Sequence, residues 1–211
     1  CRIENSRIGC SEADGIEMDG YRNVVYNNEV SAIGKTGIRM LGGDRSLLIP
    51  SDSTVENNII HDFGEVVTVY EGACKFDGIG FTLTHNEIYN SPHYAISGNA
   101  RDLNIEYNYI HNVCREGGDC GAVYIAWWSN QNIVYQNNYM RDIYNEYGFA
   151  APAGFYADDG GSGGRAIYAG SGAGFDDGSV LGYAGDVRGD GACNFERYGK
   201  KCRSLQGGCC R

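Results

Sequence analysis

Four side chains in the second half of the sequence are of the types that acid–base catalysis uses. They are Asp119, the adjacent pair Asp158 and Asp159, and His93. Two carboxylates held close together can donate and accept a proton, and a histidine beside a carboxylate forms an acid–base pair near neutral pH. Each residue also has a structural interpretation, because an aspartate often caps a turn and a surface histidine often bonds to a loop carbonyl. The elements that position these residues must therefore be found first.

One nine-residue phrase recurs six times and organises the chain. Its fourth position is Ser or Asn and its sixth position is apolar, and its copies start at Ile3, Val25, Val55, Leu83, Ile105 and Tyr135. Spacings of 22 to 30 residues between copies are typical of single coils of a β-solenoid. We expect the fourth-position Asn to mark a bend, because Asn tolerates the left-handed backbone, and to bond along a stack of identical side chains.

A second strand is expected after each phrase. Its first inward column reads Ile16, Ile38, Cys74, Ile96, Val123 and Phe155. Side chains alternate along a strand, so the next column points outward and reads Glu17, Arg39, Lys75, Ser97, Tyr124 and Tyr156. Two positions further along lies an acid-rich column of Asp19, Leu41, Asp77, Asn99, Ala126 and Asp158. Polar and aromatic side chains of successive coils should therefore lie in line on the outer face of a parallel sheet.

Insertions border this outward face at two corners. Residues 64–72, 114–120 and 144–152 expand the corner before the second strand, and residues 42–54 and 127–134 expand the corner after it. Insertions between repeats often mark the binding face of a solenoid, so we expect a cleft there. His61 and His111 occupy the seventh position of the phrase and His85 a bend, so these three are expected to be structural.

Composition excludes several classes of partner. The chain of 211 residues has a formal net charge of −10, which argues against nucleic acid because phosphates attract Lys and Arg. It has no run of about 18 apolar residues, so no membrane span is expected. The nine cysteines are an odd number, so at least one thiol has no partner within the chain.

The sequence resembles the right-handed parallel β-helix proteins of the pectin-lyase-like superfamily. It is most similar to bacterial β-helical glycoside hydrolases with α-L-fucosidase and xylanase activities. The stretches that carry the resemblance are GIRMLGGDRSLLIPSDSTVENNIIHDFG, THNEIYNSPHYAISGNARDLNIEYNYIHNVCREGGDCGAVY and FYADDGGSG. The fold implied is all-β, a single solenoid of about six coils with an irregular C-terminal tail, and the location implied is extracellular or periplasmic.

The resemblance implies a glycoside hydrolase that acts on a polysaccharide or oligosaccharide from plants or microbes. Asp119 and one acid of the Asp158–Asp159 pair match the catalytic carboxylates, with His93 assisting. In such a site Tyr124 and Tyr156 could stack on sugar rings. Trp127 and Trp128 are further candidates: one could form a stacking platform for a sugar, and one is expected to pack the insertion.

Two alternatives remain open. A polysaccharide lyase would use Arg39 or Lys75 to neutralise a uronate and abstract a proton, with Ca²⁺ bridging the acid-rich column. A carbohydrate-binding or adhesion solenoid would bind sugar without forming a product. The hydrolase needs no cofactor, and Ca²⁺ is expected only for the lyase.

The predicted register places Asp119 far from Asp158. Seven extended residues would separate them by about 23 Å, whereas a catalytic pair requires roughly 5–9.5 Å. The hydrolase therefore requires the insertion at 114–120 to fold back over the sheet. A Cys114–Cys120 disulfide could pin such a loop, and Gly117 and Gly118 would permit the bend.

The chain departs from the family pattern in three places. In the fifth coil, the segment before the second strand carries one acid, Asp119, where two adjacent acids are usual in the family. In the sixth coil, Ala157 stands where a larger apolar residue is expected. After Gly164 the Asn-containing coils stop. We therefore divide the chain into a β-helix domain at 1–163 and an irregular Gly/Cys-rich tail at 164–211, which is either a linker or a frameshifted sequence joined to a fragment.

Overall fold

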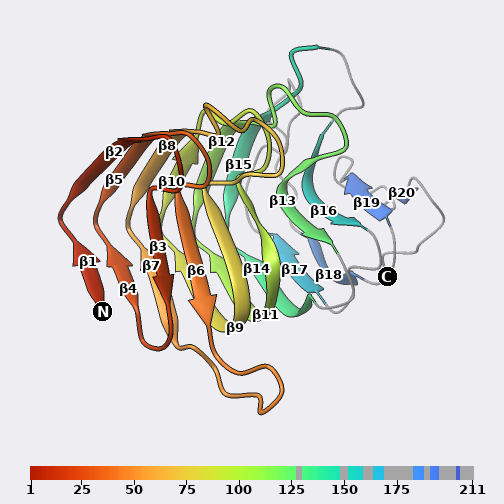
Figure 1. Ribbon diagram of the computed structural model, residues 1–211. Helices are drawn as coiled ribbons and strands as arrows, with labels where there is room; N and C mark the ends of the chain where they lie inside the picture. Colours follow the sequence, from red (N-terminus) through yellow and green to blue (C-terminus); the bar gives the residue numbers. More distant parts are fainter. Residues whose placement is uncertain are drawn as a thin grey trace.

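The computed structural model describes residues 1–126, 130–147 and 152–158, and the backbone of four later strands (Figure 1). These later strands are β17 (Gly164–Tyr168), β18 (Tyr183–Val187), β19 (Gly191–Asn194) and β20 (Arg203–Ser204). The described residues form strands and connecting loops, and none of them forms a helix long and apolar enough to cross a bilayer.

The strands stack in parallel and form three faces, as predicted for a parallel β-helix. One face, here called the site face, contains β3 (Ile16–Asp19), β6 (Ile38–Gly42), the first halves of β9 (Cys74–Thr84) and β11 (Ile96–Glu106), β13 (Gly121–Ala126) and β16 (Ala153–Asp158). The second face contains β1 (Arg2–Glu4), β4 (Val24–Tyr26), β7 (Ser53–Glu56), the second halves of β9 and β11, β14 (Gln131–Gln136) and β17.

The third face is a separate six-stranded sheet. It contains β2 (Arg7–Ser11), β5 (Glu29–Ile33), β8 (Ile59–Phe63), β10 (Glu87–Tyr89), β12 (Tyr109–Val113) and β15 (Tyr139–Ile143). His61 stacks on Tyr89 here and Tyr89 on His111, with ring centroids 4.7 and 4.9 Å apart. These two histidines therefore lie on a different face from the other candidates, in agreement with a structural role.

The predicted register is confirmed in every coil. Ile3 pairs with Val25, and the same column continues through Val55, Leu83, Ile105 and Tyr135. On the site face the inward column from Ile16 to Phe155 also pairs as predicted. Apolar side chains of equivalent positions thus lie above one another and fill one continuous core.

Buried asparagines form a ladder at the corner between the second and third faces. Asn28, Asn58, Asn86, Asn108 and Asn138 are each at most 4% exposed. The backbone N–H of Asn58 donates to Asn86 Oδ1 at 2.9 Å, and Asn58 Nδ2 donates to the carbonyl oxygen of Val25 at 3.0 Å. Each amide thereby satisfies buried polar backbone groups that no strand pairing reaches.

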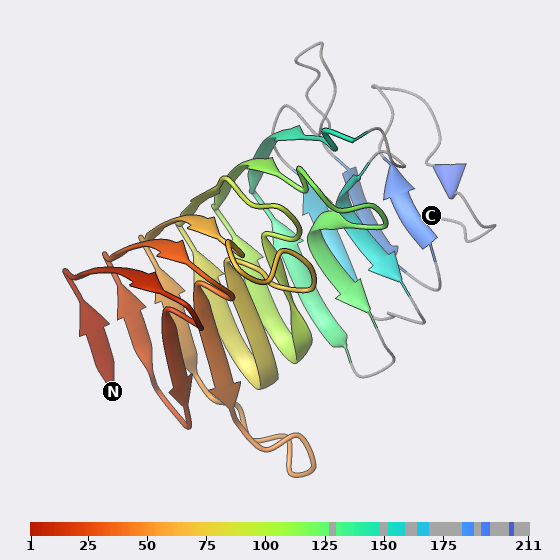
Figure 2. The same cartoon turned by 45° about the horizontal axis from the view of Figure 1, so that its top comes forward.

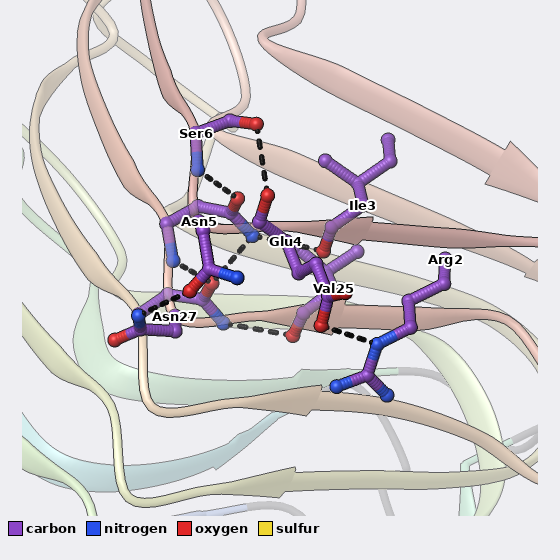
Figure 3. A network of polar contacts seen from close by, with 9 residues as sticks. Arg2, Ile3, Glu4, Asn5, Ser6, Val25 and Asn27 are labelled. Carbon is purple, nitrogen blue, oxygen red and sulfur yellow. Dashed lines mark hydrogen bonds and ion pairs between the residues drawn. The ribbon is translucent and has the colours of Figure 1, made fainter.

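The expected position of the left-handed backbone is wrong by one residue. The residue before each ladder position adopts it, with φ between 52° and 57° at Asn5, Asn27, Asn57, His85, Tyr107 and Asn137. These side chains lie outside the core, and Asn27 Nδ2 donates to Asn5 Oδ1 at 2.7 Å (Figure 3). The ladder amide itself faces inward, because its role is to bond to the neighbouring coil.

Glycines form the bend between the site face and the second face. Gly42 and Gly78 pair with each other on adjacent coils and have φ values of 146° and 129°. A Cβ on Gly78 would lie 1.9 Å from the carbonyl oxygen of Gly42. This bend therefore requires glycine on two grounds, the positive φ and the close approach of the next coil.

Strands continue into the tail that was expected to be irregular. β17 pairs in parallel with β14, as a further coil would, whereas β18, β19 and β20 pair antiparallel with their neighbours. The asparagine phrase does not recur with these strands. The change from parallel to antiparallel pairing coincides with the loss of the repeat.

We expect Asn58→Ala to lower the free energy of unfolding by about 3 kcal/mol, because several buried backbone groups lose their partner. Urea denaturation of the full chain measures this change. Asn57→Gly is the matched control, since Asn57 is exposed and its left-handed backbone suits glycine; it should change stability by less than about 0.5 kcal/mol. Equal losses in the two variants would contradict the assigned role of the ladder.

Candidate active site

The candidate site lies where loops of three successive coils meet beside the site face. These loops precede β9, β11 and β13, and Figure 2 shows them grouped on one side of the coil stack. The backbone N–H groups of Glu116 and Gly117 donate to the carbonyl oxygen of Pro92, at 2.9 and 3.1 Å. The loop at 114–120 therefore packs on the preceding coil rather than extending away from it.

Asp119 reaches the next coil through this loop. Its exposed carboxylate accepts a hydrogen bond from the Tyr156 hydroxyl, with an Oη–Oδ1 distance of 2.6 Å. Asp119 adopts the left-handed backbone, with φ of 53°. The loop therefore reaches a residue of β16, the site-face strand of the next coil. That it brings Asp119 within catalytic distance of Asp158 stays a prediction.

Tyr156 and Asp158 lie on the same strand, β16. Asp158 is two positions beyond Tyr156 on β16 and pairs with Ala126, so its Cα lies about 6.6 Å along the strand from that of Tyr156. The structure describes the backbone of Asp158, whereas Asp159, Trp127 and Trp128 lie outside the described residues. The roles of these four residues stay predictions.

His93 is buried beside the Asp119 loop. Its side chain is 4% exposed, and its Nδ1 has no hydrogen-bond partner among the described atoms. A Cβ on Gly117 would lie 2.1 Å from His93 Cδ2, so only glycine leaves room for the ring. Burial lowers the pKa of His93 from 6.5 to about 4, against the opposing effect of the Asp119 carboxylate. His93 is therefore a neutral imidazole at neutral pH.

A row of tyrosines crosses the site from coil to coil. Tyr94 stacks on Tyr124 with ring centroids 4.5 Å apart, and Tyr124 meets Tyr156 edge to face at 5.3 Å. Tyr70 extends the row, at 6.3 Å from Tyr94, and is 69% exposed. The sequence identified Tyr124 and Tyr156 from their column, whereas Tyr70 and Tyr94 lie in loops that the column does not reach.

The two basic candidates are engaged by acids of their own face. Arg39 lies between Asp14 and Asp77, with N–O distances of 3.6 and 3.8 Å. Lys75 Nζ donates to Glu71 Oε2 at 3.0 Å, and Glu71 also accepts from Thr36. A uronate carboxylate would have to displace these acids in order to pair with either cation.

The acid-rich column does not form a metal centre within the described residues. Leu41 lies between Asp19 and Asp77 in the register, and Asp77 faces Arg39. Across residues 1–126, 130–147 and 152–158, no three His, Cys, Asp or Glu side chains group closely enough to hold an ion. Asn99 of the same column accepts a hydrogen bond from Arg45, at 2.7 Å.

The paired repeats, the three faces and the asparagine ladder are the features expected of a parallel β-helix. Residues 1–174 match the family described as the right-handed β-helix region. The chain belongs to the right-handed β-helix family. No curated protein matches the sequence.

Two solved structures share the fold of this chain. The A-module of the Azotobacter vinelandii mannuronan C-5 epimerase AlgE4 has a TM-score of 0.55 and 15% identity, over 81% of this chain and 53% of that one. A structure described as a glycoside hydrolase has a TM-score of 0.53 and 17% identity, over 80% of this chain and 33% of that one. The chain thus spans about half the length of the epimerase module and a third of the length of the glycoside hydrolase. At these sequence identities the similarity concerns the fold alone.

The buried neutral imidazole gives a pH prediction. Folded His93 takes up a proton near pH 4, whereas histidine in the unfolded chain does so near 6.5, so between these values the unfolded state binds more protons. The contribution of His93 to the free energy of unfolding is therefore fully present above pH 6.5. It falls by on the order of 3 kcal/mol as the pH drops from 6.5 through 4.

Urea denaturation of the wild type and of His93→Gln between pH 7 and pH 4 isolates this component. We expect the free energy of unfolding of the variant to fall less over this interval, because its amide does not titrate. Parallel pH profiles for the two proteins would mean that His93 protonates freely in the folded state.

Proposed function

We propose that this right-handed β-helix protein is a glycoside hydrolase that cleaves a polysaccharide or oligosaccharide bound along the tyrosine row. The observation that carries the proposal is the hydrogen bond between Tyr156 and Asp119. It brings a carboxylate from the loop of one coil to the coil that also carries Asp158 and Asp159. Glycosidic hydrolysis needs two carboxylates on either side of the scissile bond.

Asp119 and one of Asp158 or Asp159 would share the acid and base roles. One carboxyl group protonates the leaving oxygen, and the other activates water or attacks the anomeric carbon. The Tyr156 hydroxyl orients the Asp119 carboxylate by bonding to Oδ1. Because Asp119 is exposed, its carboxylate is accessible to a bound sugar.

His93 would position the Asp119 loop and supply a neutral imidazole beneath it. Its burial at 4% exposure and its contact with Gly117 mean that the ring supports the loop from the core side. A neutral imidazole can donate or accept one hydrogen bond without adding charge beside the carboxylate. We assign it an assisting role rather than that of the proton donor.

The solvent-accessible members of the tyrosine row, Tyr70, Tyr124 and Tyr156, favour a carbohydrate substrate, whereas Tyr94 is buried and supports them. Aromatic side chains present apolar surface and a hydroxyl together, which suits the mixed surface of a sugar.

The ion pairs of the basic residues favour a neutral substrate. The paired state of Arg39 and Lys75 leaves both cations already neutralised by Asp14, Asp77 and Glu71. The lyase alternative, which uses one of these cations with Ca²⁺ on an acidic sugar, is therefore less well supported.

The test is hydrolysis of a panel of neutral and uronate-containing glycans by the full chain, with new reducing ends as the readout. Asp119→Asn should lower kcat by about 10³-fold, because loss of a general acid or base typically costs 10²–10⁴-fold. Asp142→Asn is the matched control and should keep wild-type activity. Both aspartates have φ of 53°, which Asn tolerates, but Asp142 lies on the third face.

The other outcomes of this assay separate the alternatives. Products that absorb in the ultraviolet and disappear with a chelator would identify a lyase and contradict hydrolysis. Glycan binding without any product, unchanged in Asp119→Asn and Asp158→Asn, would identify a binding solenoid.

Tyr156→Phe tests whether the hydroxyl or only the ring contributes. The variant keeps the aromatic surface but loses the hydrogen bond to Asp119, so we expect kcat to fall by roughly 10- to 100-fold with little change in KM. Tyr139→Phe, on the exposed third face, serves as the control. An unchanged kcat in Tyr156→Phe would mean that the hydroxyl has no role and that only the ring of Tyr156 contributes.

A further inference from the structure

Two buried cysteines stand at the two ends of the loop that carries Asp119. Cys114 directly follows β12, and Cys120 directly precedes β13. Their exposed fractions are 0% and 2%, and both are free thiols in the structure. The loop between them contains the glycine that His93 packs against and the carboxylate that Tyr156 holds.

The backbone fixes both thiols with respect to the core. The N–H of Cys114 donates to the carbonyl oxygen of His93 at 2.9 Å, and Cys114 adopts the left-handed backbone with φ of 63°. The Cys120 thiol donates to the carbonyl oxygen of Gly117 at 3.5 Å. A non-glycine residue keeps such a backbone only where its surroundings hold it, so the loop ends have one defined arrangement.

The register brings the two cysteines to the same place. The Cys114 N–H donates to the carbonyl oxygen of His93, and Cys120 precedes Val123 by three residues as His93 precedes its partner Ile96, so Cys120 occupies the equivalent position on the next coil. A hydrogen bond with Cys120 and burial both raise the pKa of Cys114, burial being the larger cause. Cys74, the remaining buried cysteine among the described residues, has its pKa raised by burial alone. The fold therefore juxtaposes one pair of thiols and isolates a third.

We propose that Cys114 and Cys120 form a disulfide that closes the loop carrying Asp119. The two thiols lose two protons and two electrons, and a small-molecule disulfide such as oxidised glutathione accepts both electrons and is released as two thiols. One mixed disulfide forms and is then displaced by the second cysteine. Both thiols are already buried at the ends of the loop, so neither has to leave the core for the bond to form.

Closure would restrict the loop rather than create the site. Since the ring closes over few residues, it removes conformations in which Asp119 moves away from Tyr156. The proposal concerns covalent structure and does not rest on the proposed hydrolase activity. A glycan assay that fails would leave it unaffected.

Peptide mapping of the full chain tests the proposal directly. The protein is equilibrated with a mixture of reduced and oxidised glutathione, quenched with acid, alkylated after unfolding and digested with trypsin. Cleavage at Arg101, Arg115 and Arg141 places the two cysteines in separate peptides, 102–115 and 116–141. We expect these peptides to be joined by a disulfide, and Cys74 to be alkylated as a free thiol.

The same mixture in concentrated guanidinium is the control for chance pairing. The linked peptides should then require roughly tenfold more oxidised glutathione, because the fold no longer holds the thiols together. The linked protein should also unfold at a Tm about 5 °C above that of the reduced protein. Equal linkage in the folded and unfolded chains, free thiols at both positions, or linkage of Cys120 to another cysteine would each overturn the proposal.

Discussion

The chain turns sharply at every corner of a β-helix, and the backbone groups at those corners cannot all be satisfied by pairing with the next coil. The asparagine ladder satisfies them with side chains of the adjacent coils. Asn58, at 1% exposure, bonds both to the coil before it and to the coil after it. An unsatisfied buried amide costs more than a typical hydrogen bond contributes, so each coil is held at one register. Everything else in the structure depends on that register.

Because the register is fixed, residues on successive coils become neighbours on one surface. Residues that are 22 to 37 positions apart in sequence, such as Asp119 and Tyr156, come into hydrogen-bond distance because their coils stack in order. The phrase keeps the coils uniform, and the insertions make them different from one another. The candidate site lies where the insertions at 64–72 and 114–120 and the shorter loop before β11 meet a uniform sheet. Rigid strands hold Tyr124 and Tyr156, while loops supply His93 and Asp119.

The sequence was sufficient to predict the strands, the inward and outward columns and the coil pairing of the repeats up to Asp158, but not strands β17 to β20, where the phrase no longer recurs. These features follow from the alternation of apolar and polar side chains along each strand and from the spacing of the asparagines. Each asparagine bonds only to the adjacent coils. Asp119 could be named, but its contact with Tyr156 could not, because the path of a loop depends on packing against Pro92 and His93 rather than on periodicity. For the same reason Tyr70 and Tyr94 gave no signal. The left-handed residue was misplaced by one position because Asn suits both the bend and the ladder.

A crystal structure of the full chain with a bound oligosaccharide would show whether the carboxyl groups of two coils act on one glycosidic bond. The quantity to measure is the separation between the carboxyl group of Asp119 and those of Asp158 and Asp159. We expect one separation of roughly 5–9.5 Å, with the glycosidic oxygen between the two groups. Separations above about 12 Å for both acids, with the sugar bound elsewhere, would contradict it.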